Sequence, residues 1–170
     1  MAEDYHVDLS GRLHRKKKIG VACVGATTKT NNGCVISSDL KEFIQKELFA
    51  GKKKSDCAKL YAIIIYNLIV SKLDDIKTLI ICNDADFTYT KHYLEILLSK
   101  HTYNFQIISI TKFKGILGRK VNSLADNFAG HYRKRGLKKN RWNKGRPLNV
   151  VTINYLLVKS QWAMIEKDKE

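Results

Sequence analysis

The stretch YHVDLSGRLHRKKKIGVACVGATTKTNNGCVIS, residues 5–37, decides the fold class of this chain. It contains three runs of branched, aromatic and small apolar residues, at 5–10, 18–26 and 28–37, and an Asn-Gly turn signal lies within the third. Strands joined by short turns pair in an antiparallel manner. Residues 5–37 therefore predict a three-stranded antiparallel meander.

Helices and strands alternate after the meander. A short amphipathic helix is predicted over 38–50, with an apolar face made of Leu40, Phe43, Ile44 and Leu48. A longer apolar helix, capped by Ser55 or Asp56, runs to about residue 72 and is expected to pack on a sheet. The next strand, KTLIICND (77–84), is apolar on both faces, which is typical of a central strand parallel to a neighbour.

The rest of the chain continues this alternation. A helix over 87–100, a strand over 104–111 and a helix over 119–135 are expected in turn. Pro147 and Asn149 can start a last helix, which carries apolar residues at helical spacing. The order predicts an α/β fold with a five-stranded mixed sheet, three strands antiparallel and then parallel ones, flanked by helices. We expect one domain over 1–136, with a basic segment and C-terminal helix over 137–170 packed on it or appended to it.

The charge of the chain indicates its partner. Lys and Arg number 31 against 16 Asp and Glu, a formal net charge of +15. Such an excess favours nucleic acid as the partner. Residues 131–146 hold eight Lys or Arg and no acid, and Tyr132 and Trp142 among them are suited to stacking on bases. The alternative is a cationic surface that only maintains solubility.

The cysteines and the apolar runs bear on the compartment. The four cysteines lie on apolar segments and form no CxxC pair, so we expect buried reduced thiols and no zinc site. No apolar run reaches membrane-spanning length, and the N-terminus does not resemble a signal peptide. These features predict a cytoplasmic protein in a reducing environment, without a membrane partner.

Three aspartates stand where the predicted topology brings them together. Asp8 lies in the first strand, Asp84 ends the fourth, and Asp126 lies between alanines on the helix over 119–135. A carboxylate on a central strand is costly to desolvate unless a cation meets it. The carboxyl ends of central strands also face the ligand cleft of an open sheet. Together the three acids predict a shared divalent cation.

The chemistry of the ligands selects the metal. Oxygen ligands without a nearby His or Cys favour Mg or Mn over zinc, and beside a basic surface such a metal indicates phosphodiester chemistry. Each acid alone has a plainer explanation: Asp84 as a turn residue, Asp8 as a solvated edge residue, and Asp126 as a partner that balances the positive charges near it. The prediction of a metal site depends on the three together.

Three short motifs, NSLADNFA (122–129), HVDLSG (6–11) and CNDAD (82–86), occur in the order and spacing that is typical of one family. On these motifs the chain resembles the ribonuclease H family over about residues 5–135. NSLADNFA (122–129) is similar to the N-x-x-A-D-x-x-A pattern of that family's final helix, whose aspartate binds metal. HVDLSG (6–11) is similar to the first-strand motif, and CNDAD (82–86) to the fourth-strand element. The resemblance implies a ribonuclease H-like fold, Mg or Mn as cofactor, and as catalytic metal ligands Asp8, Asp84 and Asp126.

The sequence departs from the family pattern at Lys59. The family's first long helix carries a fourth acid in a pattern like A-E-x-x-A, and the matching stretch here is AKLYA (58–62). An ammonium close to a divalent cation would repel it. Either the domain is catalytically silent, or another acid completes the set and Lys59 points away from the cleft or reaches a substrate phosphate. Asp56 is the first substitute, because it lies three residues earlier on the same helix face, and Asp86, which could instead cap a helix, is the second.

The basic residues complete the expected site. The loop FKGILGRKV lacks the histidine that many family members carry before the last helix. Nucleic-acid contacts are expected from Lys59, Lys114, Arg119, Lys120, Arg133, Lys134, Arg135, Lys138, Lys139, Arg141 and Trp142.

The leading hypothesis is a magnesium-dependent endonuclease that cuts the RNA strand of RNA/DNA hybrids. The alternatives are an inactive nucleic-acid-binding domain of the same fold, a junction or DNA nuclease of that fold, and a basic ribosome-associated or structural protein.

Overall fold

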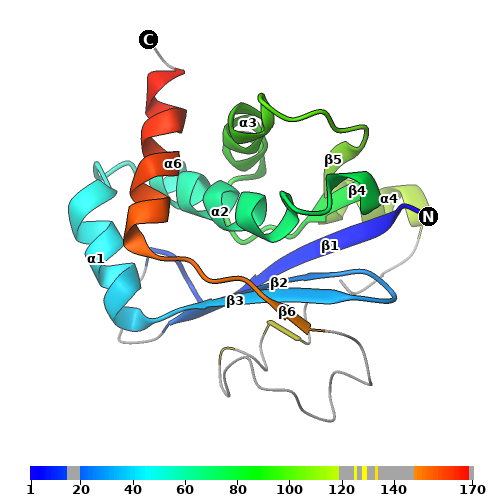
Figure 1. Ribbon diagram of the computed structural model, residues 1–170, viewed down its shortest axis with the longest axis horizontal. Coiled ribbons are helices and arrows are strands. Elements are labelled where there is room, and N and C mark those ends of the chain that lie inside the picture. Colours follow the sequence, from blue (N-terminus) through cyan, green and yellow to red (C-terminus); the bar gives the residue numbers. More distant parts are fainter. Residues whose placement is uncertain (15–19, 119–124, 126–127, 130–132, 134–147, 169–170) are drawn as a thin grey trace.

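The computed structural model describes residues 1–14, 20–118, 125, 128–129, 133 and 148–168. Over these residues the protein has an α/β architecture, with a six-stranded mixed sheet and five α-helices (Figure 1). This confirms the α/β class expected from the sequence. No helix of the described residues is long and apolar enough to cross a membrane.

The sheet has the strand order β5-β4-β1-β2-β3-β6. Its strands are β1 (Glu3–Ser10), β2 (Val21–Ala26), β3 (Asn31–Ile36), β4 (Ile76–Ile81), β5 (Gln106–Ser109) and β6 (Leu148–Val150). The first three strands pair in an antiparallel manner, as the sequence predicts. On the other side of β1, β4 and then β5 pair in parallel. The predicted central position of β4 is thereby confirmed.

Four helices cover one face of the sheet (Figure 1). They are α1 (Ser38–Leu48), α2 (Lys53–Ile69), α3 (Phe87–Leu98) and α6 (Tyr155–Lys167). The α2 helix lies between the sheet and the helices α3 and α6, which explains why its body from 57 to 65 is buried on all sides. Its apolar sequence is that of a fully buried helix rather than of an amphipathic one.

Two small clusters of apolar side chains lie on the opposite face of the sheet. Ala22, Val24 and Ala26 of β2 form a buried cluster with Ala125 and Ala129. Farther along the same face, α4 (Ile110–Leu117) brings Phe113 against the isoleucines of β4 and β5. Alternation along β1 places its even-numbered residues on this face, because His6 is opposite Ala26 and Asp8 is opposite Val24.

Three predicted boundaries are wrong. Ile110 and Thr111 begin α4 instead of ending a strand, because Ser109 caps the helix through a bond from the Lys112 amide to its Oγ (3.2 Å). Residues 148–150 form β6, which pairs in parallel with β3 and so covers an edge that would otherwise present unpaired backbone groups. The last helix accordingly begins at Tyr155, capped by the side chain of Asn154.

Two details of the helices also differ from expectation. Phe43 of α1 is 46% exposed, while Lys41 is buried and donates to the Arg12 carbonyl oxygen (3.4 Å). The α2 helix begins at Lys53, one turn before the expected caps. The predicted helix over 119–135 and the basic segment after it lie mostly outside the described residues.

Candidate carboxylate site

The site begins where β4 ends. After Ile81 the chain stays beside β1, because the Cys82 amide donates to the Val7 carbonyl oxygen (3.0 Å). Two residues later, Asp84 Oδ2 accepts a hydrogen bond from the Leu9 amide (3.2 Å). Leu9 directly follows Asp8, so the carboxylate of Asp84 is held at the peptide that joins Asp8 to Leu9. The structure therefore brings these two predicted acids together.

Asp8 itself is 7% exposed and belongs to the face of the sheet that carries the alanine cluster. Ala125 and Ala129, the alanines of the NSLADNFA pattern, are fully buried against that same face. Asp126 lies outside the described residues, and only its neighbour Ala125 is placed by the structure. The alanines thus account for the spacing of the pattern, since they bring this part of the chain close to β2.

A tyrosine from α2 completes the described part of the site. Tyr61 is fully buried, and its hydroxyl donates to Asp84 Oδ2 (3.4 Å). Burial raises the pKa of Tyr61 well above its ordinary value, and electrostatic interactions with Cys23, Asp84, Cys82 and Asp8 raise it further. The hydroxyl is therefore protonated at neutral pH and acts as a donor.

Both carboxylates act on the same buried groups. The pKa of Cys23 is raised well above normal, first by burial, then by Cys34, and then by Asp84 and Asp8. Asp8 and Asp84 thus lie within electrostatic reach of one thiol and one phenol, Cys23 and Tyr61. This agrees with the backbone geometry, which places Asp8 on β1 and Asp84 just beyond the end of the neighbouring strand β4.

The two acids considered as substitutes for the family glutamate are engaged elsewhere. Asp56 is buried, and its Oδ2 accepts from the amides of Ala50 (3.0 Å) and Lys52 (2.9 Å), which closes the turn before α2. Asp86 is the N-cap of α3 and accepts from the Tyr89 amide (3.0 Å). Neither of these bonds involves Asp8 or Asp84, and each explains its acid as a local stabiliser of a helix start.

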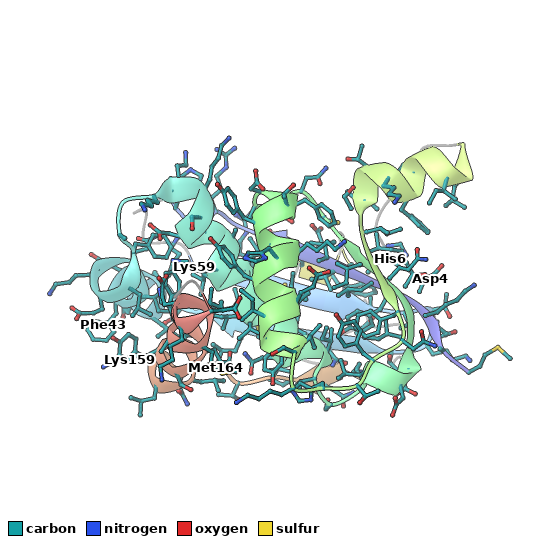
Figure 2. All side chains as sticks on the ribbon, turned by 90° about the horizontal axis from the view of Figure 1, so that it is seen from above. Asp4, His6, Phe43, Lys59, Lys159 and Met164 are labelled. Atoms are coloured by element: carbon teal, nitrogen blue, oxygen red, sulfur yellow. The ribbon has the colours of Figure 1, made fainter. Side chains whose placement is uncertain are left out.

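Lys59 is directed away from the carboxylates. Its ammonium is buried, pairs with Glu166 of α6, and lies over the rings of Trp162 (5.0 Å to the centroid) and Tyr93 (5.9 Å). In Figure 2, Lys59 and His6 of β1 lie on opposite sides of α3. The expected repulsion of a cation by Lys59 is thus avoided, and in this position the ammonium is not available to a nucleic-acid chain.

Two of the remaining predicted nucleic-acid contacts belong to the described residues. Lys114 is exposed on α4, and Arg133 is half-buried. The others lie outside the described residues: Arg119, Lys120, Lys134, Arg135, Lys138, Lys139, Arg141 and Trp142.

Sequence reasoning did not single out Tyr61, although it stands in the AKLYA stretch. The available signal was a tyrosine hydroxyl in a mostly apolar helix body, because a buried Tyr hydroxyl normally finds a partner.

Among the described residues, no three His, Cys, Asp or Glu side chains are grouped in a way that could hold a metal ion. Asp8 and Asp84 are two carboxylates of such a grouping, and a third would have to come from the part of the chain that contains Asp126. Comparisons with models of protein families, with curated proteins and with solved structures give no match to this chain.

Proposed function

We propose that this protein is a metal-dependent endonuclease of ribonuclease H type, which hydrolyses the RNA strand of RNA/DNA hybrids. The observation that carries the proposal is the hydrogen bond from the Leu9 amide to Asp84, which holds the carboxylate of Asp84 beside the backbone of Asp8, 76 residues earlier in the sequence. Asp8 is buried and Asp84 is exposed, so the site has one carboxylate that is costly to desolvate and one that solvent can reach, and a cation bound there would stabilise the charge of both.

The topology supports the proposal. The resemblance of the sequence implies three antiparallel strands followed by parallel strands, and the order β5-β4-β1-β2-β3 with its observed directions agrees with this. We assign the chain a ribonuclease H-like fold on these grounds, together with the burial of Ala125 and Ala129 against β2.

The donor set suits magnesium or manganese. Asp8 and Asp84 would hold the ion with Asp126, all three through hard oxygen atoms. A divalent ion bound there would polarise the phosphodiester and offset the charge that develops during its hydrolysis. The protein's own part is to hold the Asp84 carboxylate through the Leu9 amide and Tyr61, and to keep the ammonium of Lys59 away in its pair with Glu166.

The charge of the chain supports a polyanionic substrate. A formal net charge of +15 favours contacts to phosphates, and such contacts weaken steeply as salt rises. Exposed Lys114 on α4 is positioned by the same helix that packs on β4 and β5. The substrate would therefore be recruited by backbone charge.

The test is a cleavage assay on an RNA/DNA hybrid with and without Mg or Mn. We expect wild type to cut the RNA strand only when a divalent ion is present. Asp8→Asn, Asp84→Asn and Asp126→Asn should each abolish cutting and leave hybrid affinity nearly unchanged, since each removes a metal ligand and no phosphate contact. Asp74→Asn, in the 3-10 turn Leu73–Asp75, is the matched control and should cut normally.

One observation favours a second candidate, an inactive nucleic-acid-binding domain of the same fold. The α2 helix directs Lys59 to Glu166 and offers Tyr61, not a carboxylate, to Asp84. Hybrid binding without cleavage in both Mg and Mn would establish this second function. Cutting of DNA duplexes or junctions in preference to hybrids would instead assign the protein to a different nuclease class.

A further inference from the structure

We infer that Tyr61 is a positioning residue for the carboxylate site, and that its hydroxyl is the contribution of α2 to that site. The inference rests on the proposed function, in which Asp84 is a metal ligand. It differs from the sequence expectation, which looked for a carboxylate on this helix and considered Asp56 and Asp86.

The geometry of α2 selects Tyr61. Successive residues of an α-helix are separated by about 100°, so Lys59 and Tyr61 project from nearly opposite sides. Lys59 meets Glu166 on α6, and Tyr61 meets Asp84 beyond the end of β4. The side of α2 that faces the carboxylates therefore presents a neutral hydroxyl.

The contact with Asp84 fixes the orientation of its carboxylate. Oδ2 accepts from the Leu9 amide (3.2 Å) and from the Tyr61 hydroxyl (3.4 Å), two donors that belong to different elements, β1 and α2. Two donors on one oxygen restrict rotation of the carboxylate plane. Donors behind a metal-binding carboxylate orient it in this way in metal sites generally.

The burial of Tyr61 makes the arrangement rigid. Its side chain is fully buried and belongs to the main core, and its helix lies between the sheet and α3. A phenol in such a position is held by its ring, so the hydroxyl cannot move away from Asp84 without disturbing the core. The orientation of Asp84 is thereby coupled to the packing of α2.

A hydroxyl has a different effect on charge from a carboxylate. It supports Asp84 without adding negative charge, so the attraction for a divalent ion comes from Asp8, Asp84 and Asp126 alone. The metal affinity of the site should then depend strongly on how well each of those acids is oriented.

Tyr61→Phe tests the inference, because it removes one oxygen atom and keeps the ring. We measure Mn²⁺ binding by electron paramagnetic resonance and the Mg²⁺ concentration that gives half-maximal hybrid cleavage. The dissociation constant for Mn²⁺ and this Mg²⁺ concentration should both rise by about 10- to 100-fold, the usual effect of losing such a donor. Excess metal should restore the cleavage rate, which a general loss of structure would not permit.

Tyr93→Phe is the matched control. Tyr93 is also a buried helical tyrosine, and its hydroxyl bonds Ser55 Oγ (2.7 Å) rather than an acid of the site. Its metal dependence should equal that of wild type. Thermal unfolding of both variants reports whether either has lost structure.

The outcomes separate the two claims. If Tyr61→Phe binds metal as tightly as wild type while Asp84→Asn does not bind it, the role of Tyr61 is overturned and the proposed function stays intact. If wild type, Asp8→Asn and Asp84→Asn all bind Mn²⁺ equally, or if none of them binds it, the proposed function is overturned and the role of Tyr61 with it.

Discussion

At the residue scale, the account depends on which side of α2 each polar residue occupies. The sequence places Lys59 and Tyr61 two positions apart, and the chemistry of both could be read from it. Their directions could not be read, because α2 is apolar around its circumference and the hydrophobic pattern does not set its rotation. The structure resolves this through two contacts, Lys59 with Glu166 and Tyr61 with Asp84.

A glycine beneath another tyrosine gives a prediction at this scale. A Cβ atom added to Gly25 of β2 would collide with the ring and hydroxyl of Tyr5, which is fully buried. Overpacking of this kind costs about 1–3 kcal/mol, and we expect Gly25→Ala to lower the free energy of unfolding by about 3 kcal/mol. Urea denaturation measures this change in the free energy of unfolding.

Gly115→Ala is the control for that substitution. Gly115 lies in α4 with open space around its Cβ position. Alanine there should raise the free energy of unfolding by about 0.5–1 kcal/mol, since it favours the helix. Equal effects of the two substitutions would contradict the packing assigned to Tyr5.

At the element scale, the strands of the meander and β4 were predictable and β6 was not. The composition of the first strands and the apolar run of β4 identify these elements in the sequence. The Asn-Gly pair expected as a turn signal is instead part of β3, where Asn32 pairs with Gly25 and Gly33 with Val24. Residues 148–150 are too few to show a strand pattern in the sequence, and their strand state comes from pairing with β3. Tertiary pairing of this kind overrides local preference.

The start of α4 was missed for a different reason. The isoleucines of β5 (QIIS) are followed closely by another isoleucine, Ile110, so the strand pattern of the sequence extends past the cap at Ser109. The α4 helix itself was not predicted, because FKGILGRKV (113–121) was expected to be a loop, and that expectation is wrong for residues 113–117. The helix ends at Gly118, which has a φ of 63°, the left-handed conformation that glycine adopts after a helix. Local capping residues thus carried information that the apolar pattern concealed.

The docking of α6 gives a prediction at the same scale. Glu166 of α6 pairs with the buried ammonium of Lys59, beside the ring of Trp162. Glu166→Gln leaves that ammonium buried with a neutral partner. Because Glu166 is 44% exposed at its side chain, solvent offsets part of the loss, and we expect a decrease of about 1–2 kcal/mol in the free energy of unfolding.

The surface pair Lys91–Glu95 supplies the comparison. Both of its side chains are more than 40% exposed on α3, at a distance of 3.7 Å. Glu95→Gln should change the free energy of unfolding by no more than about 0.5 kcal/mol. If Glu166→Gln were equally mild in the same denaturation experiment, the Lys59 pair would not be what holds α6 to α2.

At the scale of the whole molecule, the fold places acids from distant parts of the chain at one point of a basic protein. The sequence predicted that Asp8 and Asp84 meet, because strand ends in a mixed sheet have known positions. It could not predict the hydrogen bond to Leu9, which depends on how the chain continues beyond β4. Asp126 remains a prediction, supported by the burial of Ala125 on the face of Asp8.

The most direct test of the central claim is a crystal soaked in Mn²⁺ and measured for anomalous scattering. The account predicts a peak within coordination distance of the carboxylates of Asp8 and Asp84, with the Tyr61 hydroxyl still bonded to Asp84. A map with no peak between these two carboxylates, at a manganese concentration that saturates the protein in solution, would contradict it.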